Sequence, residues 1–344
     1  MDVTAWAVSQ GLPVRELFPP VIEETQPHLG DDAAAQNEFT RHLEFLKRPQ
    51  TLIAIEGAFI RDATGIVELP DGRVCYEGNW WLPLLQEHPA YRRRFFLKQR
   101  RLDGNWYSLQ CLWSSEYYHW FHDVLPRLEN ALPYLPANTR FLINETPRAF
   151  QLESLKAYGI PVGKLEFQPP GIRTRIECLW FATPVGHSTL GSGKVIRQVA
   201  GRLKNFFLDD QPHTPLRRIY VSRQKALSRR IVNEVELQSA LKEHGFDPMV
   251  LEDLTWLEQL QLFSNTEAIM GPHGAGLMNM IFAKENAVIY EISALAKTVP
   301  CYLVLAGQLN YKFQRLQARA AGDETTADMR VLPEDISRLF KINL

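Results

Sequence analysis

The sequence lacks any long apolar run, any excess of one charge and any closely spaced pair of cysteines. No stretch reaches the roughly 18 consecutive apolar residues that a membrane-spanning helix requires. The 38 Lys and Arg residues nearly balance 39 Asp and Glu residues, whereas a general nucleic-acid-binding protein normally carries a basic excess. The four cysteines lie far apart, so we expect free, mostly buried thiols of a reducing compartment: Cys75, Cys111, Cys178 and Cys301.

The N-terminus lacks the basic segment and the apolar stretch of a signal peptide. We therefore expect a cytoplasmic protein. Internal repeats and low-complexity segments are also absent from the sequence, which argues against a solenoid or a repeat array.

The length of 344 residues exceeds what a single hydrophobic core usually supports, and 45% of the residues are hydrophobic. Two domains are therefore expected. The glycine-rich break "GHSTLGSG" at residues 186–193 suggests a boundary, which gives an N-terminal α/β domain over 1–192 and a C-terminal Rossmann-like domain over 193–344.

The first domain is expected to begin with an irregular or partly helical lead-in over the first 50 residues. Strands and helices then alternate along the chain, and this alternation predicts an α/β fold whose second half is built from parallel βαβ units. The expected strands are 51–60, 65–78 with a hairpin turn at Asp71–Gly72, 108–113, 140–145, 176–183, 217–223, 247–252, 267–270 and 287–292. The expected helices are 150–160, 194–208, 233–245, 255–265 and 275–283.

The segment "GPHGAGLMN" at residues 271–279 places glycines around His273 between an expected strand and an expected helix. Gly274 and Gly276 permit close backbone approach and positive φ angles. A helix that begins near Ala275 would direct its N–H groups and its dipole at an anion such as a diphosphate, to which His273 can donate a further hydrogen bond. The spacing matches neither GxGxxG nor GxxxxGK[ST]. The alternative is a tight turn with a capped helix and a structural histidine.

A second cluster is the basic segment "YVSRQKALSRRIVNE". Ser222 and Arg223 end an expected strand, and Arg229 and Arg230 come just before the next helix. Because the carboxyl ends of parallel strands meet at one edge of a sheet, Arg223 and one of the other two arginines are expected near the anion at His273. The alternative is a solvated basic loop.

A third cluster lies in "EYYHWFHDVLPRL". On a helix, His119 and Asp123 share a face and His122 is adjacent to it. An imidazole oriented by a carboxylate can act as a general base. The alternatives are a surface pair of modest energy and structural histidines among aromatic residues. The spacing is not one that zinc sites normally use, so no metal site is expected.

These segments resemble glycosyltransferase family 61. The succession Ser-Arg, Arg-x-x-x-Asn-Glu and His-Gly-Ala-Gly-Leu-x-Asn is typical of the family, and "YYHWFHDVLPRL" is similar to its His-x-x-x-Asp helix. The tryptophan and the Leu-Pro-Arg-Leu ending look like the bacterial branch, which includes capsule-synthesis proteins. The resemblance covers about residues 50 to 295.

The resemblance implies a GT-B-like fold, in which two Rossmann-like domains face each other across a cleft. It implies inverting transfer of a sugar from a nucleotide sugar to a glycan or lipid-linked glycan, in synthesis of a surface polysaccharide. His119 and Asp123 would act on the acceptor. The diphosphate would be bound by the other candidate residues, which are Ser222, Arg223, Arg229 or Arg230, His273, Gly274, Ala275 and Gly276. Peripheral contact with the inner membrane or with a polysaccharide assembly complex stays open.

Position also suggests that Glu291, at the end of the last expected strand, reaches the nucleoside. The sequence contains no Asp-x-Asp triplet. Arginines, a histidine and a helix N-terminus can compensate the phosphate charge instead, so we expect no metal and no other cofactor. Two alternatives remain, namely another polysaccharide-modifying transferase such as a pyruvyltransferase, and an inactive nucleotide-sugar- or glycan-binding module. The His119/Asp123 pair argues against the inactive module.

Overall fold

The computed structural model describes residues 2–75, 98–111, 113–209, 215–294, 299–321 and 327–341. The chain forms two compact units. Unit 1 comprises Met1–Glu23 and His42–Val199, and unit 2 comprises Glu24–Arg41 and Ala200–Leu344. The division therefore falls inside helix α8 (Gly193–Leu208) rather than at the glycine-rich break before it. The assignment of residues 24–41 to unit 2 is a feature that the sequence did not predict.

Unit 1 contains a mixed sheet. Its parallel pairs are β5 with β6, β5 with β8 and β6 with β7. Every pair that involves β1, β2, β3 or β4 is antiparallel. Its strand order is β1-β2-β8-β5-β6-β7, with β3 and β4 beside β8. Only half of this sheet is therefore Rossmann-like. The strands are β1 (Val14–Phe18), β2 (Gln50–Glu56), β3 (Phe59–Arg61), β4 (Ile66–Glu68), β5 (Lys98–Ser108), β6 (Arg140–Asn144), β7 (Leu165–Gln168) and β8 (Ile172–Ala182). The longer helices outside the site are α1 (Val3–Ser9) and α7 (Ala149–Lys156).

The strand expected over 108–113 is wrong, because β5 ends at Ser108. Ser108 Oγ accepts a hydrogen bond from the Gln110 backbone N–H at 3.2 Å, which turns the chain there. The real strand lies earlier, in the polar run "KQRRLDGNWYS". The turn expected at Asp71–Gly72 is confirmed, since Gly72 has a φ of 83° and Glu68 bridges to Val74.

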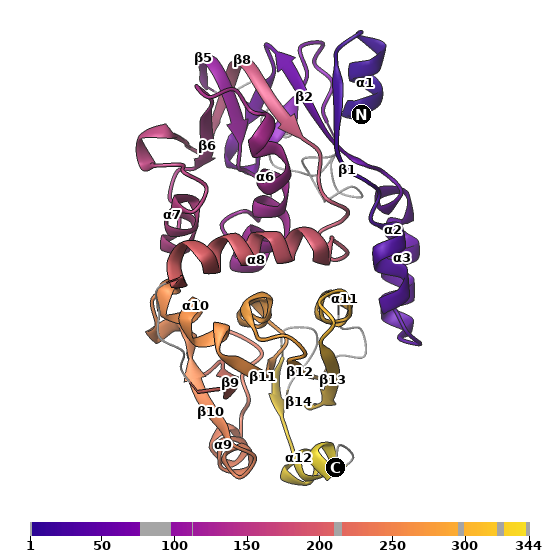
Figure 1. Ribbon diagram of the computed structural model, residues 1–344, viewed down its shortest axis with the longest axis vertical. Coiled ribbons are helices and arrows are strands. Elements are labelled where there is room, and N and C mark those ends of the chain that lie inside the picture. The colour runs from indigo at the N-terminus through magenta and orange to yellow at the C-terminus, as the bar shows by residue number, and fades with distance from the viewer. Residues whose placement is uncertain are drawn as a thin grey trace. The chain divides into compact units, whose positions relative to one another are not determined.

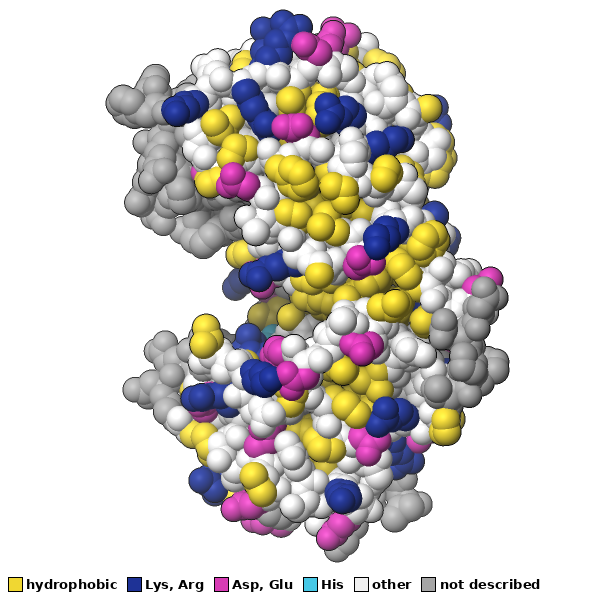
Figure 2. Space-filling view, turned by 90° about the vertical axis from the view of Figure 1, so that its left-hand side faces the viewer, with side chains coloured by type: hydrophobic (Ala, Val, Ile, Leu, Met, Phe, Trp, Pro, Cys, Tyr) yellow, Lys and Arg dark blue, Asp and Glu magenta, His cyan; other side chains and the backbone are white. Residues whose placement is uncertain are grey.

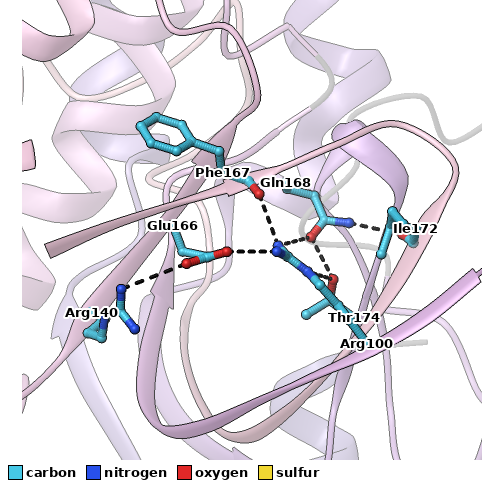
Figure 3. Close-up of polar contacts among 7 residues, drawn as sticks. All are labelled: Arg100, Arg140, Glu166, Phe167, Gln168, Ile172 and Thr174. Atoms are coloured by element: carbon cyan, nitrogen blue, oxygen red, sulfur yellow. Dashed lines mark hydrogen bonds and ion pairs between the residues drawn. The ribbon is translucent and has the colours of Figure 1, made fainter. Parts of the chain in front are cut away.

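A network around Arg100 explains how so polar a strand lies inside the sheet (Figure 3). The Arg100 guanidinium of β5 donates to Glu166 Oε1 at 2.7 Å and Gln168 Oε1 at 2.9 Å on β7, and to Thr174 Oγ1 at 2.9 Å on β8. Arg140 of β6 lies 3.7 Å from the other oxygen of Glu166. Charge-assisted hydrogen bonds thus join β5, β7 and β8, and an ion pair adds β6, where apolar contacts would otherwise be needed.

Unit 2 is built on a parallel sheet with the strand order β10-β9-β11-β12-β13 (Figure 1). The order reverses between β9 and β11, and ligands of open α/β sheets bind outside the carboxyl ends of the strands at such a point. The strands are β9 (Arg217–Ser222), β10 (Phe246–Val250), β11 (Thr266–Pro272), β12 (Val288–Ser293) and β13 (Lys312–Gln317). The helices include α9 (Glu234–Lys242), α10 (Trp256–Ser264), α11 (Cys301–Gln308) and α12 (Pro333–Lys341). Two short strands, β14 (Arg319–Ala321) and β15 (Asp328–Arg330), pair in antiparallel orientation.

From β9 to β12, the unit 2 elements match the predicted parallel βαβ alternation with one correction, whereas the elements after β12 were not predicted. The segment after the glycine turn, Ala275–Phe282, is a 3₁₀ helix rather than an α-helix. Its N–H groups at the first turn are nevertheless free of intrahelical partners, as at any helix start.

The N-terminal lead-in also contributes to unit 2. It contains α2 (Ile22–Thr25), a 3₁₀ turn over Gln26–His28 and the beginning of α3 (Ala33–Leu46). His28 packs so closely against Gly307 of α11 that a Cβ there would lie 2.6 Å from its ring. Gln308 donates to Thr25 Oγ1 at 3.4 Å. Residues 24–41 of the lead-in are therefore packed into unit 2, whereas the rest of the lead-in belongs to unit 1.

The surface is mixed in charge. On the face shown in Figure 2, lysine and arginine side chains are interspersed with aspartate and glutamate, in keeping with a net charge of −1. The four cysteines are free and three of them are buried, as predicted. In the part of the chain that the structure describes, no helix has both the length and the apolar character needed to cross a membrane.

Candidate active site

The first candidate cluster lies in unit 1 on a helix with an irregular turn. Helix α5 (Tyr117–His119) continues into a π-helix over Trp120–Val124 and then into α6 (Leu125–Ala131). The Leu125 N–H bonds to the Trp120 carbonyl, five residues back. Pro126 has no N–H to offer to the carbonyl four residues before it, which favours such a local irregularity. Single π-turns are frequent at functional sites.

The π-turn gathers His119, His122 and Asp123. The Nδ1 atoms of His119 and His122 lie 2.7 Å and 2.8 Å from the two carboxylate oxygens of Asp123. An ionised Asp123 accepts from both rings, which places the proton of each neutral ring on Nδ1 and leaves Nε2 as the acceptor. The side chain of His119 is 19% exposed, against 4% for Asp123 and 2% for His122. His119 is therefore the member of the cluster that a substrate can reach.

The charge of Asp123 is stabilised by its two neighbours. Burial raises its pKa, but the hydrogen bonds from His119 and His122 outweigh burial and hold the pKa below the ordinary value of 3.8. The carboxylate is thus ionised at neutral pH and orients His119.

His122 has a larger role than a residue merely adjacent to the face. Its ring stacks on Tyr118 at 4.8 Å, and the Tyr118 hydroxyl donates to the Ser188 carbonyl at 3.0 Å. A Cβ at Gly191 would lie 2.8 Å from the His122 ring, so the loop around Gly191 needs a glycine at that point. His122 is a buried positioning residue for Asp123.

The second cluster lies in unit 2, where β9 and β11 end at the reversal of strand order. Arg223 follows β9 and Gly274 follows β11. A Cβ built at Gly274 would collide with the Arg223 guanidinium, so the two residues lie side by side as predicted. Arg223 donates to the Ser228 carbonyl at 3.1 Å. Burial and the charge of Arg229 both lower the pKa of Arg223.

The structure also separates Arg229 from Arg230. Arg229 has a φ of 56°, and its Nε is buried without a hydrogen-bond partner. Arg230 is half exposed and pairs with Asp328 at 2.7 Å. Arg229, rather than Arg230, is therefore the arginine close to Arg223. Within the described residues, neither the Arg223 nor the Arg229 guanidinium group forms an ion pair with a carboxylate. Two adjacent, half-buried cations are a suitable site for an anion.

Ser222 has a structural contact in this turn. Its buried hydroxyl accepts a hydrogen bond from the Gln224 backbone N–H at 3.2 Å. It therefore shapes the turn that presents Arg223.

His273 is held from behind by buried groups. Its Nδ1 lies 2.5 Å from Glu291 Oε1, and the Glu291 side chain is fully buried. The prediction that Glu291 reaches a nucleoside does not fit this placement, because the carboxylate is fully buried and bonds Nδ1 of His273. The Tyr302 hydroxyl, whose pKa burial raises well above 10.0, donates to the Gly274 carbonyl at 2.7 Å. The turn is therefore fixed at both His273 and Gly274.

Of the two reasons expected for the glycines, close approach of the backbone and positive φ, the structure supports only close approach. None of the three glycines in the turn has a φ in the left-handed region, and Gly274 has extended backbone with a φ of 170°. The constraint is steric instead, since a Cβ at Gly274 would strike Arg223 and one at Gly276 would lie 3.0 Å from Val221. Ala275 and Gly276 begin the 3₁₀ helix, and their N–H groups are available to an anion.

Comparison with known proteins adds the family. The model described as Glycosyltransferase 61 matches residues 117–290, half of the chain. The chain belongs to glycosyltransferase family 61. The matched range contains His119, Asp123, Arg223, Arg229 and His273.

Several relatives carry the name EGF domain-specific O-linked N-acetylglucosamine transferase. The rat protein is 36% identical over 83 residues, which are 23% of this chain and 16% of that protein. The Drosophila melanogaster protein is 29% identical over 111 residues, or 31% and 21%, and the Xenopus laevis protein is 29% identical over 134 residues, or 37% and 25%. The chain thus spans a quarter or less of the length of these relatives.

Sequence reasoning missed several residues that support the site. Tyr302 and Arg315 lie outside every motif, in an apolar helix and a half-polar strand. Asp32 belongs to a lead-in that showed little periodicity. Of the residues that support the two clusters, His122 could be recognised from the sequence, because it directly precedes Asp123.

The contact between Gly274 and Arg223 gives a first prediction. Gly274→Ala should displace the Arg223 side chain and weaken pyrophosphate binding by about tenfold, the equivalent of one charge-assisted hydrogen bond. The unfolding temperature should change little, because a flexible side chain can move aside. Calorimetric titration and thermal unfolding measure both quantities. Gly201→Ala in α8, where a Cβ meets nothing within 4 Å, is the control, and equal affinities in the two variants would contradict the assignment.

The lowered pKa of Asp123 gives a second prediction, on stability. Because the folded-state pKa lies below 3.8, the ionised carboxylate contributes stability that is fully present above about pH 5 and is lost as the pH falls through the lowered pKa. Wild type should therefore unfold at a higher temperature than Asp123→Asn at about pH 6, and this difference should shrink at about pH 3. A difference that stays constant with pH would show that Asp123 is not ionised in the folded protein.

Proposed function

We propose that the chain is an inverting glycosyltransferase that moves a sugar from a nucleotide sugar to a hydroxyl of a glycan acceptor. The observation that carries this proposal is the adjacent guanidinium groups of Arg223 and Arg229 at the strand-order reversal of unit 2, where Arg223 lies against Gly274 and, within the described residues, neither group forms an ion pair with a carboxylate. In a member of glycosyltransferase family 61, the anion best suited to this site is the diphosphate of the donor.

Unit 2 would stabilise the leaving group. When the bond between the sugar C1 and the diphosphate oxygen breaks, negative charge develops on the diphosphate. Arg223, Arg229 and the N–H groups of Ala275 and Gly276 are preorganised donors for that charge. His273 adds a donor from Nε2 when the ring carries both protons, with Nδ1 held by Glu291.

Unit 1 would supply the base. The acceptor oxygen forms the new bond to C1, and its proton passes to Nε2 of His119. Asp123 holds the opposite nitrogen of the ring and stabilises the imidazolium that results. A direct displacement of this kind inverts the configuration at C1.

The proposed sugar and the proposed acceptor rest on two different observations. The names of the relatives mention N-acetylglucosamine, which makes N-acetylglucosamine the first sugar to assay, linked in turn to each nucleotide. For the acceptor, we propose a surface polysaccharide, capsular or exopolysaccharide, or its lipid-linked precursor. The support is the similarity of the segment around Trp120 and "LPRL" to bacterial members of the family. We also propose a cytoplasmic location for the reaction.

The decisive experiment combines donor assays with variants of unit 1. His119→Ala and Asp123→Asn should each lower turnover by about 10²–10⁴-fold, the usual contribution of a positioned base. Nucleotide affinity should change little. The double variant should be scarcely worse than the more damaging single one, because the two residues act as a unit. His122→Ala should cost less, since His122 acts only through Asp123.

The control for these measurements is His244→Ala, which removes a ring that stacks on Phe340 in unit 2. Near-normal turnover in both His119→Ala and Asp123→Asn would show that the helical segment with these residues serves only in packing. No transfer from any UDP-, GDP- or CMP-linked sugar by the wild-type protein would refute the proposed activity itself.

Metal independence is a further prediction. Since Arg223, Arg229 and the first N–H groups of the 3₁₀ helix can supply the charge compensation, transfer should persist in EDTA at a rate similar to that of the untreated protein. The assay compares initial rates before and after dialysis against chelator. Complete loss of activity, restored by manganese or magnesium, would contradict the prediction.

A further inference from the structure

A continuous chain of charged contacts runs behind His273, away from the Arg223 and Arg229 pair. His273 Nδ1 lies 2.5 Å from Glu291 Oε1, and Arg315 Nε donates to Glu291 Oε2 at 3.0 Å. Arg315 Nη1 in turn donates to Asp32 Oδ2 at 2.8 Å. His273 directly follows β11, Glu291 lies in β12 and Arg315 lies in β13. Asp32 lies in the part of the lead-in that belongs to unit 2, as do the other three residues.

The fully buried carboxylate of Glu291 needs both of its partners. An uncompensated buried charge is strongly destabilising, so a carboxylate with no exposure is normally retained only with hydrogen bonds to both oxygens. Burial opposes ionisation of Arg315, but Glu291 and then Asp32 raise its pKa. Arg315 therefore fixes the orientation of Glu291, and Glu291 fixes the orientation of the His273 ring.

Asp32 is itself held rigidly. It stands directly before α3 (Ala33–Leu46), where its Oδ1 accepts from the Ala35 N–H at 2.9 Å and caps the helix. Its other oxygen is thereby directed at Arg315. The lead-in is anchored nearby through His28 on Gly307 and Thr25 on Gln308. A residue near the start of the chain thus completes a contact to a strand 283 residues later.

We propose that Asp32 and Arg315 are positioning residues for His273, so that the N-terminal lead-in is a working part of the anion site. This inference rests on the proposed function. Asp32 holds Arg315, Arg315 holds Glu291, and Glu291 keeps the Nε2 side of His273 toward the ligand. Neither Asp32 nor Arg315 touches the ligand.

One alternative is that Arg315 binds the anion directly, since its Nη2 is buried without a hydrogen-bond partner. The two roles differ in a double-mutant cycle. A positioning residue matters only while His273 is present, whereas a direct ligand of the anion continues to matter in a His273→Ala background.

The test uses the full chain, with pyrophosphate and UDP as calorimetric probes. Asp32→Asn is the main variant, because asparagine caps a helix as well as aspartate does and the protein should fold normally. Asp32→Asn should weaken binding of both probes by about threefold. Arg315→Lys should weaken it by a similar or larger factor, because Asp32 and Arg315 belong to one chain of contacts. Neither substitution should weaken binding further when His273 is replaced by alanine.

The matched control is Asp247→Asn, which removes an exposed pair with Arg217 at 2.8 Å in the same unit and should leave both affinities unchanged. Unchanged affinity in Asp32→Asn, with a clear loss in His273→Ala, would overturn the inference and leave the anion site intact. A further loss on adding Arg315→Lys to His273→Ala would also overturn it, in favour of direct contact. Absence of binding of either probe to the wild-type protein would overturn both the anion site and the inference.

Discussion

A buried carboxylate behind a partly exposed histidine is the interaction on which both candidate clusters depend. Asp123 is 4% exposed behind His119 at 19%, and Glu291 is fully buried behind His273 at 13%. In each case the carboxylate binds Nδ1 and directs Nε2 outward. The second carboxylate oxygen accepts a hydrogen bond from another side chain, which is His122 in unit 1 and Arg315 in unit 2. Because burial makes an unpaired carboxylate costly, both arrangements hold the histidine in one orientation.

The two clusters nevertheless suit opposite tasks. In unit 1, two histidines share one carboxylate, and within the described residues no arginine or lysine forms an ion pair with Asp123. A neutral ring there can accept a proton. In unit 2, the surroundings of His273 include Arg223 and Arg229, which favour a bound anion over a free base. The division of roles therefore follows from local charge rather than from the histidines themselves.

Much of unit 2 could be predicted from the sequence, because short apolar strands alternate with helices and their carboxyl ends must meet at one edge. That rule was sufficient to place Arg223 beside Gly274. Unit 1 was harder to predict. Strand β5 contains Arg100, whose charge is satisfied by Glu166 and Gln168 on a distant segment, so its polar sequence gave no strand signal. The sequence also does not show whether Arg229 or Arg230 lies near Arg223, because the answer depends on the contact of Arg230 with Asp328, 98 residues later.

The lead-in shows why the remainder could not be predicted. Its sequence signals are local, and Asp32 is recognisable at most as a residue suited to cap the helix that follows it. Capping uses one carboxylate oxygen and leaves the other free to bind a cation, but nothing local specifies which cation. Arg315 becomes the partner only because the sheet order places β13 beside β12, which carries Glu291. A contact of this kind is defined by topology, so it becomes visible only when the strands have been placed. The same dependence makes the lead-in sensitive to the sheet, because any change that shifts β13 against β12 alters Arg315, Glu291 and His273 together.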